Sequence, residues 1–390
     1  MSTDASAPEP LVLARRTGAV THLTLNRPRA INALSSEMFL LLAEALREVR
    51  EAVAAGQAAP DAIVIDGAGE RGFCGGGDIK ELSGKDAPRI LALEYAVDHW
   101  VATAPVPVVA IMDGIAMGGG IGLGGHASHR VVTERSRLAM PEVRIGIAPD
   151  VGGHLLLSRA PGRLGELLAA TAGEMTAADA LALGFADFYV PSDRLDALRA
   201  ALAAGEEPGA ACARFSEPAP ERSAVLAAAE WWDPIAERAL GADAAGAGSA
   251  GSGSAGAGSI GVLAAAAAAR LIAALEASEI AEARETAATI RAMCPTSVAV
   301  TLAQLARTRA AGLDLAAVLT DDLRVLGRLA PMPNFTEGVR AQVIDKDRTP
   351  VWVPATIEQL DVAELDAILD PAFGAGEVPL DLDPALPAAA

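Results

Sequence analysis

The chain has 390 residues, with 31 Lys and Arg against 50 Asp and Glu and a formal net charge of −19 at pH 7. This charge excludes nucleic acid and anionic membranes as expected partners, because both would be repelled. The three cysteines are too few and too widely spaced for a disulfide framework or a zinc site, which favours a reducing cytoplasm.

Residues 1–10, MSTDASAPEP, are expected to be disordered and show neither a secretory nor a mitochondrial targeting pattern. From residue 20 to 26 polar and apolar residues alternate, which predicts a strand. The segment after Ser35 and Ser36 has helical periodicity and a serine cap. Residues 61–69 then form a short apolar run ending in glycine, which predicts a buried strand.

The same order of elements returns further along. Residues 106–112 predict a strand, and the glycine cluster after it should open a helix. Next, SRLAMPEVRIGIAPDVGG predicts a strand and a turn, with a helix through Leu155. Strands, glycine turns and helices that alternate in this way predict an α/β core over residues 11–196.

The C-terminal half has few strand signals. Residues 197–240 and 262–365 are rich in Ala, Leu and Arg and predict helices, and no apolar run is long enough to span a membrane. Between them, residues 241–261 are Gly, Ser and Ala of low complexity, typical of a flexible linker. Residues 366–390 look like a disordered acidic tail.

Two glycine clusters stand at equivalent strand ends, in FCGGGDIKEL (73–82) and AMGGGIGLGG (116–125). Neither fits a P-loop or a dinucleotide fingerprint. One interpretation is that the glycines only permit tight turns. The other is that backbone N–H groups from both turns point at one place and form an oxyanion hole.

Two acids lie eight residues apart in MPEVRIGIAPDVGG, at Glu142 and Asp150. Their neighbours are mostly apolar residues and glycine, so burial should raise the pKa of Glu142 and make it a better base. The alternative is that both acids only cap local turns and helices.

Several motifs occur together in one order: LNRPRAINAL, GFCGGGDIKEL, DGIAMGGGIGLGGH and AMPEVRIGIAPDVGG. In this order and spacing the chain resembles the crotonase (enoyl-CoA hydratase/isomerase) superfamily over about residues 11–190. Further on, CPTSVAVTLAQL and NFTEGVRAQVIDKDRTPVW resemble the 3-hydroxyisobutyryl-CoA hydrolase subgroup. The resemblance implies a crotonase-like spiral of ββα units, followed by a helical C-terminal part.

The resemblance also implies a site for an acyl-CoA thioester. Its carbonyl oxygen would lie between the N–H groups of Gly75 and Gly119, and Glu94 would contact the substrate, although alone it looks like a solvated helix residue. Residues expected to line the acyl-CoA channel are Gly76, Gly77 and Asp78. Basic residues available for the phosphates of coenzyme A are Arg27, Arg29, Lys80 and Lys346.

The reaction type depends on the acids. Hydratases of the superfamily carry a second glutamate at the position of Gly122, whereas Asp150 stands where the hydrolase subgroup has its aspartate. The resemblance therefore implies thioester hydrolysis, with Glu142 as general base or nucleophile and Asp150 orienting water or the substrate hydroxyl. The alternatives are an enoyl-CoA hydratase or isomerase and a non-catalytic acyl-CoA-binding scaffold.

The five histidines show no metal-binding spacing, so we expect no metal and no cofactor other than the coenzyme A of the substrate. No GxSxG motif occurs in the sequence, and a serine-hydrolase mechanism is therefore unsupported. A homo-oligomer stays open.

Overall fold

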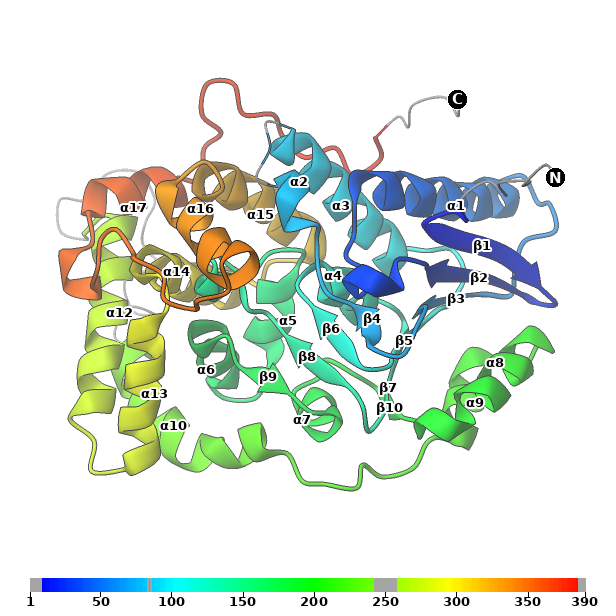
Figure 1. Cartoon of the computed structure of the whole chain (residues 1–390), viewed down its shortest axis with the longest axis horizontal. Helices are drawn as coiled ribbons and strands as arrows, with labels where there is room; N and C mark the ends of the chain where they lie inside the picture. Colours follow the sequence, from blue (N-terminus) through cyan, green and yellow to red (C-terminus); the bar gives the residue numbers. More distant parts are fainter. Residues whose placement is uncertain (1–8, 83, 85, 242–257, 385–390) are drawn as a thin grey trace, which may run out of the picture.

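Two sheets form the centre of the protein in its computed structural model, which describes residues 9–82, 84, 86–241 and 258–384 (Figure 1). The first sheet has the order β1-β2-β3-β5-β7-β10 and the second β4-β6-β8-β9. Only the β1–β2 and β8–β9 pairs are antiparallel among the described strands. The strands are β1 (Val12–Thr17), β2 (Val20–Leu25), β3 (Ala62–Gly67), β4 (Gly72–Cys74), β5 (Val108–Met112), β6 (Ile115–Met117), β7 (His129–Val132), β8 (Arg137–Ala139), β9 (Glu174–Met175) and β10 (Phe188–Tyr189).

The chain builds these sheets in repeated steps, each with one strand in each sheet followed by a helix. One step is β3, β4, then α2 (Ile79–Leu82) and α3 (Ala87–Ala102). The next is β5, β6 and α4 (Gly119–Gly125), and the third is β7, β8 and α5 (Gly153–Arg159). The predicted α/β spiral of ββα units is confirmed, and it brings the ends of β4, β6 and β8 side by side.

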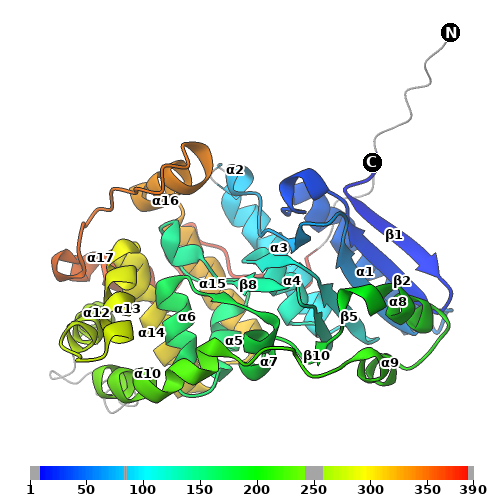
Figure 2. The ribbon, with the colours of Figure 1, turned by 60° about the horizontal axis from the view of Figure 1, so that its bottom comes forward.

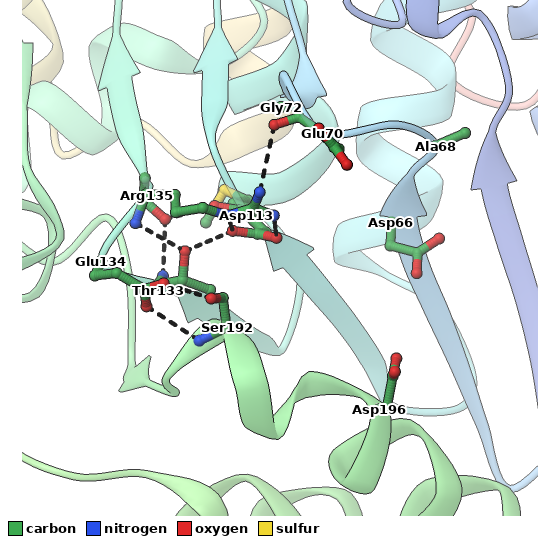
Figure 3. A network of polar contacts seen from close by, with 12 residues as sticks. Asp66, Ala68, Glu70, Gly72, Asp113, Thr133, Glu134, Arg135, Ser192 and Asp196 are labelled. Carbon is green, nitrogen blue, oxygen red and sulfur yellow. Dashed lines mark hydrogen bonds and ion pairs between the residues drawn. The ribbon is translucent and has the colours of Figure 1, made fainter.

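Polar contacts fix the corners where the chain leaves the first sheet for the second (Figure 3). Asp113, after β5, accepts hydrogen bonds from the Thr133 hydroxyl at 2.6 Å and from Nε of Arg135 at 2.9 Å, both after β7. Gly114 completes the corner with a φ of +82°, where a Cβ would lie 2.7 Å from Gly72 Cα. Only glycine fits such a close approach at positive φ, so the strands of the second sheet stay close enough to pair.

Helices cover both faces of the first sheet. On one face lies α1 (Ser36–Ala54), which Ser35 caps by accepting a bond from Met38 N–H. On the other face, α8 (Leu195–Ala203) and α9 (Pro208–Phe215) pack against β2, β3, β5 and β7 (Figure 2). These two helices and α10 (Ala224–Leu240) occupy the predicted helical segment 197–240, with α8 starting two residues earlier.

The C-terminal helices form a second layer beside α5 and α6 (Leu164–Thr171) and share the main hydrophobic core. Most of the expected linker 241–261 lies outside the described residues, and Ile260 already begins a helix. No described helix is long and apolar enough to cross a membrane. The helices are α12 (Ile260–Glu276), α13 (Ala281–Ala292), α14 (Pro295–Ala311), α15 (Leu315–Leu329), α16 (Pro333–Val339) and α17 (Val362–Leu369).

The expected disorder of residues 366–390 is wrong for residues 366–384. Residues up to Leu369 belong to α17, and the following segment is bound to the protein. Arg328 donates to the Glu377 carboxylate and to four backbone carbonyls between residues 367 and 372, and Trp100 Nε1 donates to Leu382 O at 2.7 Å. Specific hydrogen bonds thus outweigh the disorder that the acidic composition indicated. Residues 1–8 and 385–390, part of the two expected disordered ends, lie outside the described residues.

Candidate active site

Glu142 is the first residue of the short 3-10 helix η2 (Glu142–Arg144), directly after β8, and only 5% of it is exposed. Its Oε1 lies against Gly118, 3.0 Å from the place where a Cβ would stand. Its Oε2 is buried and accepts no hydrogen bond. Burial, followed by the negative charge of Asp150, raises the pKa of Glu142 well above its usual value.

Asp150 lies in the turn before α5 and is also buried. The Tyr95 hydroxyl donates a 2.7 Å hydrogen bond to its Oδ2. Burial is the largest cause that raises the pKa of Asp150 to about 7, and the charge of Asp322 raises it further while the Tyr95 bond opposes them. Such a carboxyl exchanges protons near neutral pH, as acid–base catalysis requires.

Glu94 comes from α3 and is buried at the same place. Its Oε1 lies directly against Gly119, so that a Cβ on Gly119 would collide with it, and its Oε2 is 4.0 Å from the Cβ position of Gly77. Burial and the charge of Asp150 raise the pKa of Glu94. The structure therefore brings Glu94, Glu142 and Asp150 together beside both glycine clusters.

The N–H groups at the glycine clusters correct one prediction. Gly75 N–H donates to the carbonyl of Ile31 at 2.7 Å, so the assignment of Gly75 as an oxyanion donor is wrong. In the described part of the chain, the N–H groups of Gly77 and Gly119 have no recorded acceptor. Gly77 N lies 3.3 Å from the Cβ position of Gly119, so these two donors stand together. Gly76, with a φ of +100°, lets the loop approach Met117.

A further buried carboxyl, Asp98, explains the glycine at position 122. A Cβ on Gly122 would lie 2.6 Å from Asp98 Oδ2 and 2.6 Å from Val151 Cβ. No side chain fits there, and in particular no second glutamate of the hydratase type. Asp98 is 1% exposed, its Oδ2 accepts no hydrogen bond, and its pKa is raised by burial and then by the charge of Glu94.

Tyr95, Asp98 and Asp322 were not among the site residues predicted from the sequence. For Asp98 a signal existed, because it follows Glu94 by four residues and so shares its helical face. Tyr95 belongs to the same buried side of α3. Asp322 gave no such signal, since it lies on α15 and reaches the site only through the tertiary structure.

The basic residues predicted for the coenzyme A phosphates do not form one cluster. Arg27 pairs with Asp78 at 2.7 Å, and this carboxylate also accepts from Lys80 N–H, so Arg27 and Asp78 brace the loop before α2. Arg29, Lys80 and Lys346 are exposed. Lys80 lines an open cavity of about 1170 Å³ between α2, α3, α15 and the C-terminal segment, whose lining includes none of the site carboxyls.

Two helices flank the site. The helix α2 follows Gly77, and α16 packs against the loop after Glu142, where a Cβ on Gly338 would collide with Ile145. Figures 1 and 2 show both helices at the same edge of the molecule. The carboxyls and the two free N–H groups therefore lie beneath an edge formed by segments from both halves of the chain.

Comparison with known protein families shows to which family the chain belongs. Residues 20–245 and 254–369 match the Enoyl-CoA hydratase/isomerase family. The chain belongs to this family. Its members include curated proteins similar over nearly their whole length. The 3-hydroxyisobutyryl-CoA hydrolase of Rattus norvegicus mitochondria is 34% identical over 364 residues, covering 91% of this chain and 88% of that protein. The corresponding Homo sapiens protein is 31% identical, covering 94% and 90%.

Solved structures of the same family carry other names. A carnitinyl-CoA dehydratase from Mycobacterium thermoresistibile is 35% identical with a TM-score of 0.80, over 96% of this chain and 99% of that one. An enoyl-CoA hydratase from Rhodobacter sphaeroides 2.4.1 is 34% identical with a TM-score of 0.76, over 93% and 97%. Family membership therefore leaves hydrolysis and hydration to be separated by the residues of the site.

Proposed function

We propose that this protein is a thioester hydrolase that converts 3-hydroxyisobutyryl-CoA and water to 3-hydroxyisobutyrate and coenzyme A, a step of valine catabolism. One observation carries the proposal: Glu142 and Asp150 lie beside two free N–H groups, while Asp98 fills the space of the second hydratase glutamate. The curated relatives named as hydrolases of this substrate support it.

The thioester carbonyl oxygen would accept hydrogen bonds from Gly77 and Gly119. When an oxygen nucleophile adds to the carbonyl carbon, the carbonyl electron pair moves to this oxygen, and preorganised N–H donors stabilise the charge. Loss of one such donor typically costs about 2.7–4 kcal/mol of transition-state stabilisation. The tetrahedral intermediate then collapses, the C–S bond breaks, and the sulfur of coenzyme A takes up a proton.

Glu142 would supply the base or the nucleophile. In the first route its carboxylate removes a proton from water and passes it to the departing sulfur. In the second it attacks the carbonyl carbon itself and forms a mixed anhydride, which water hydrolyses. In single-turnover hydrolysis in ¹⁸O-labelled water, label in the Glu142 side chain would establish the anhydride route, because the base route adds no oxygen to that carboxyl.

Asp150, held by Tyr95, would orient the water or the hydroxyl of the acyl group, and Glu94 would contact the acyl group beside Gly119. The exposed Lys80 and Arg89 at the rim of the 1170 Å³ cavity are the basic side chains that we propose for the phosphates of coenzyme A. The proposed reaction uses no metal or added cofactor, so a chelator should leave the rate unchanged. The cytoplasm remains the proposed location.

The second candidate function is hydration of an enoyl-CoA, or its reverse, which the names of the two solved relatives favour. Hydration is served by a second carboxylate, and a glutamate at Gly122 would collide with Asp98 and Val151. This collision is why hydrolysis is the preferred proposal.

The experiment measures free thiol released from 3-hydroxyisobutyryl-CoA, 3-hydroxypropionyl-CoA and crotonyl-CoA by the wild type, Glu142→Gln and Asp150→Asn. Hydrolysis predicts thiol release from the first two substrates and its loss in both variants, by on the order of 10²-fold or more. Loss of crotonyl-CoA absorbance without thiol release would instead establish hydration. No change with any acyl-CoA would leave a non-catalytic binding protein.

A further inference from the structure

We propose that Asp322 and His154 are positioning residues for Asp150, through which helices of the C-terminal layer hold the catalytic turn in place. This inference rests on the proposed function, since it concerns the same carboxyl. It assigns a role to a buried histidine and a buried aspartate that, among the described residues, form no hydrogen bond or ion pair with Glu142 or the glycine clusters.

The turn that carries Asp150 has an unusual backbone. Val151, a β-branched residue, has a φ of +52°, and Gly152 follows with a φ of +72°. A β-branched residue at positive φ is strained, and such a conformation persists only where the surroundings impose it. The turn therefore needs external contacts that hold it.

Among the hydrogen bonds of this turn, the one to Asp322 reaches furthest along the sequence. Its Oδ2 accepts a 2.9 Å hydrogen bond from Gly152 N–H, across 170 residues of chain. Its other oxygen, Oδ1, forms an ion pair with Nε2 of His154 at 2.8 Å. A carboxylate on α15 is thus joined both to the turn and to the first part of α5.

His154 links this carboxylate to a second helix. Its Nδ1 shares a 2.8 Å hydrogen bond with the Thr308 hydroxyl on α14. His154 and Asp322 are both 1% exposed or less, so water does not compete for these contacts. Helices α14 and α15 thereby bind Gly152 and His154, the residues on either side of Gly153.

Asp322 and His154 depend on each other electrostatically, because the buried carboxylate needs a basic partner. Asp322 lies near Asp150, and its negative charge raises the pKa of that carboxyl while His154 lowers it. Asp321, 4.0 Å from His154 Nε2, is already paired with Arg307 and Arg324, which leaves His154 as the basic partner of Asp322. A buried carboxylate deprived of its partner is strongly destabilising.

The experiment compares Asp322→Ala, Asp322→Asn and His154→Gln with the wild type in three measurements. These are kcat and KM for 3-hydroxyisobutyryl-CoA, hydrogen–deuterium exchange of a peptide spanning residues 145–157, and thermal unfolding. The matched control is His22→Gln, which makes the same change in another histidine–aspartate pair, His22 with Asp66 at 2.9 Å, on the first sheet.

We expect Asp322→Ala to lower kcat by about 10-fold or more, the equivalent of one hydrogen bond to a charged group, with KM within about 3-fold. Hydrogen–deuterium exchange of the peptide spanning residues 145–157 should be faster in Asp322→Ala than in the wild type. Asp322→Asn keeps an oxygen that accepts from Gly152 N–H and should recover most of kcat, as should His154→Gln, whose amide can meet both partners. His22→Gln should change neither kcat nor exchange at the turn.

Wild-type kcat and turn exchange in a folded Asp322→Ala would overturn the positioning role, as would an equal loss in the control. If Asp322→Ala fails to fold, His154→Ala takes its place, because it removes the contacts with Asp322 and Thr308, and wild-type kcat and turn exchange in a folded His154→Ala would likewise overturn it. Where the wild type releases no thiol from any acyl-CoA, the proposed function fails instead. Exchange at residues 145–157 then still decides whether Asp322 holds the turn.

Discussion

The Tyr95 hydroxyl donates to Oδ2 of Asp150 at 2.7 Å, and this bond joins the helix that carries Glu94 to the turn before α5 that carries Asp150. Both residues are buried, with Tyr95 at 0% exposure. The bond favours the ionised form of Asp150, against the burial that raises its pKa to about 7. The ionisation of Asp150 near neutral pH therefore depends on a residue in a different structural unit.

Tyr95→Phe should move the acid limb of the pH–rate profile to higher pH. Removing the bond removes the contribution that lowers the pKa of Asp150, so ionisation requires a higher pH and hydrolysis at pH 6.5 falls by about 10-fold. The measurement is kcat/KM between pH 5.5 and 9. The chain has one other tyrosine, and Tyr189→Phe, on β10, is the matched control. An unmoved acid limb in Tyr95→Phe would refute the assignment.

Asp98→Asn should stabilise the fold at alkaline pH. The pKa of Asp98 is raised above 3.8 by burial and neighbouring carboxylates, so the folded chain binds more protons than the unfolded one. The contribution of Asp98 to the free energy of unfolding is therefore fully present below about pH 4. It is lost as the pH rises through the pKa that Asp98 has in the folded protein. A neutral amide avoids this loss and should raise Tm at pH 8.5 by on the order of 1–2 °C.

The control for this prediction is Asp66→Asn. The pKa of Asp66 is lowered, by contacts with His22 and Arg199 that outweigh its burial, so its ionised form stabilises the fold. This stability is present above the unfolded pKa and lost in acid, and the substitution should lower Tm at pH 8.5. Thermal unfolding of both variants at pH 5 and 8.5 checks the opposite signs. Equal shifts in the two variants would contradict the argument.

Much of this arrangement follows from local sequence. The strands at Val20 and Asp61 and the cap at Ser35 are visible because apolar periodicity and capping residues act over a few positions. Glu142 stood out because an acid is rare among apolar residues. Family resemblance then supplied Glu94 and Gly119, which no local pattern distinguishes from ordinary helix and turn residues.

The rest depends on contacts between distant segments. Three consecutive glycines offer three N–H groups, and only the position of the Ile31 carbonyl shows that the donor of Gly75 is occupied. Asp322 reaches Gly152 across 170 residues. The acidic composition of the C-terminal segment likewise gave no sign that Arg328 would bind it. Such pairings arise from packing rather than from periodicity.

Gly122→Ala should impair both stability and activity. The added Cβ would lie 2.6 Å from Asp98 Oδ2 and from Val151 Cβ, next to the Asp150 turn, and such overpacking costs about 1–3 kcal/mol. Gly327→Ala is the control, since a Cβ on this α15 residue meets nothing within 4 Å and alanine favours the helix by ~0.5–1 kcal/mol.

The same collision gives a prediction about reaction type. Gly122→Glu should lose thioester hydrolysis without gaining hydration of crotonyl-CoA, because its side chain cannot enter the space that Asp98 occupies. Absorbance of the enoyl thioester and release of thiol, followed together, check both activities. Efficient hydration by this single variant would show that Asp98 does not exclude the second glutamate.

Arg328→Met should release the C-terminal segment. The guanidinium donates to both oxygens of Glu377 at 2.8 Å and to four carbonyls between residues 367 and 372, and its side chain is only 14% exposed. Methionine keeps the apolar stem but leaves these acceptors without a donor, which should lower the free energy of unfolding by about 2–3 kcal/mol. Proteolysis should then cut residues 371–384 faster.

The control is Arg291→Met, which breaks more exposed pairs with Glu276 and Glu358 and should lower the free energy of unfolding by only ~0–1 kcal/mol. Because the segment also lines the cavity beside Lys80, its release should raise KM for the acyl-CoA more than it lowers kcat. Equal protease resistance in the two variants would show that Arg328 does not hold the segment.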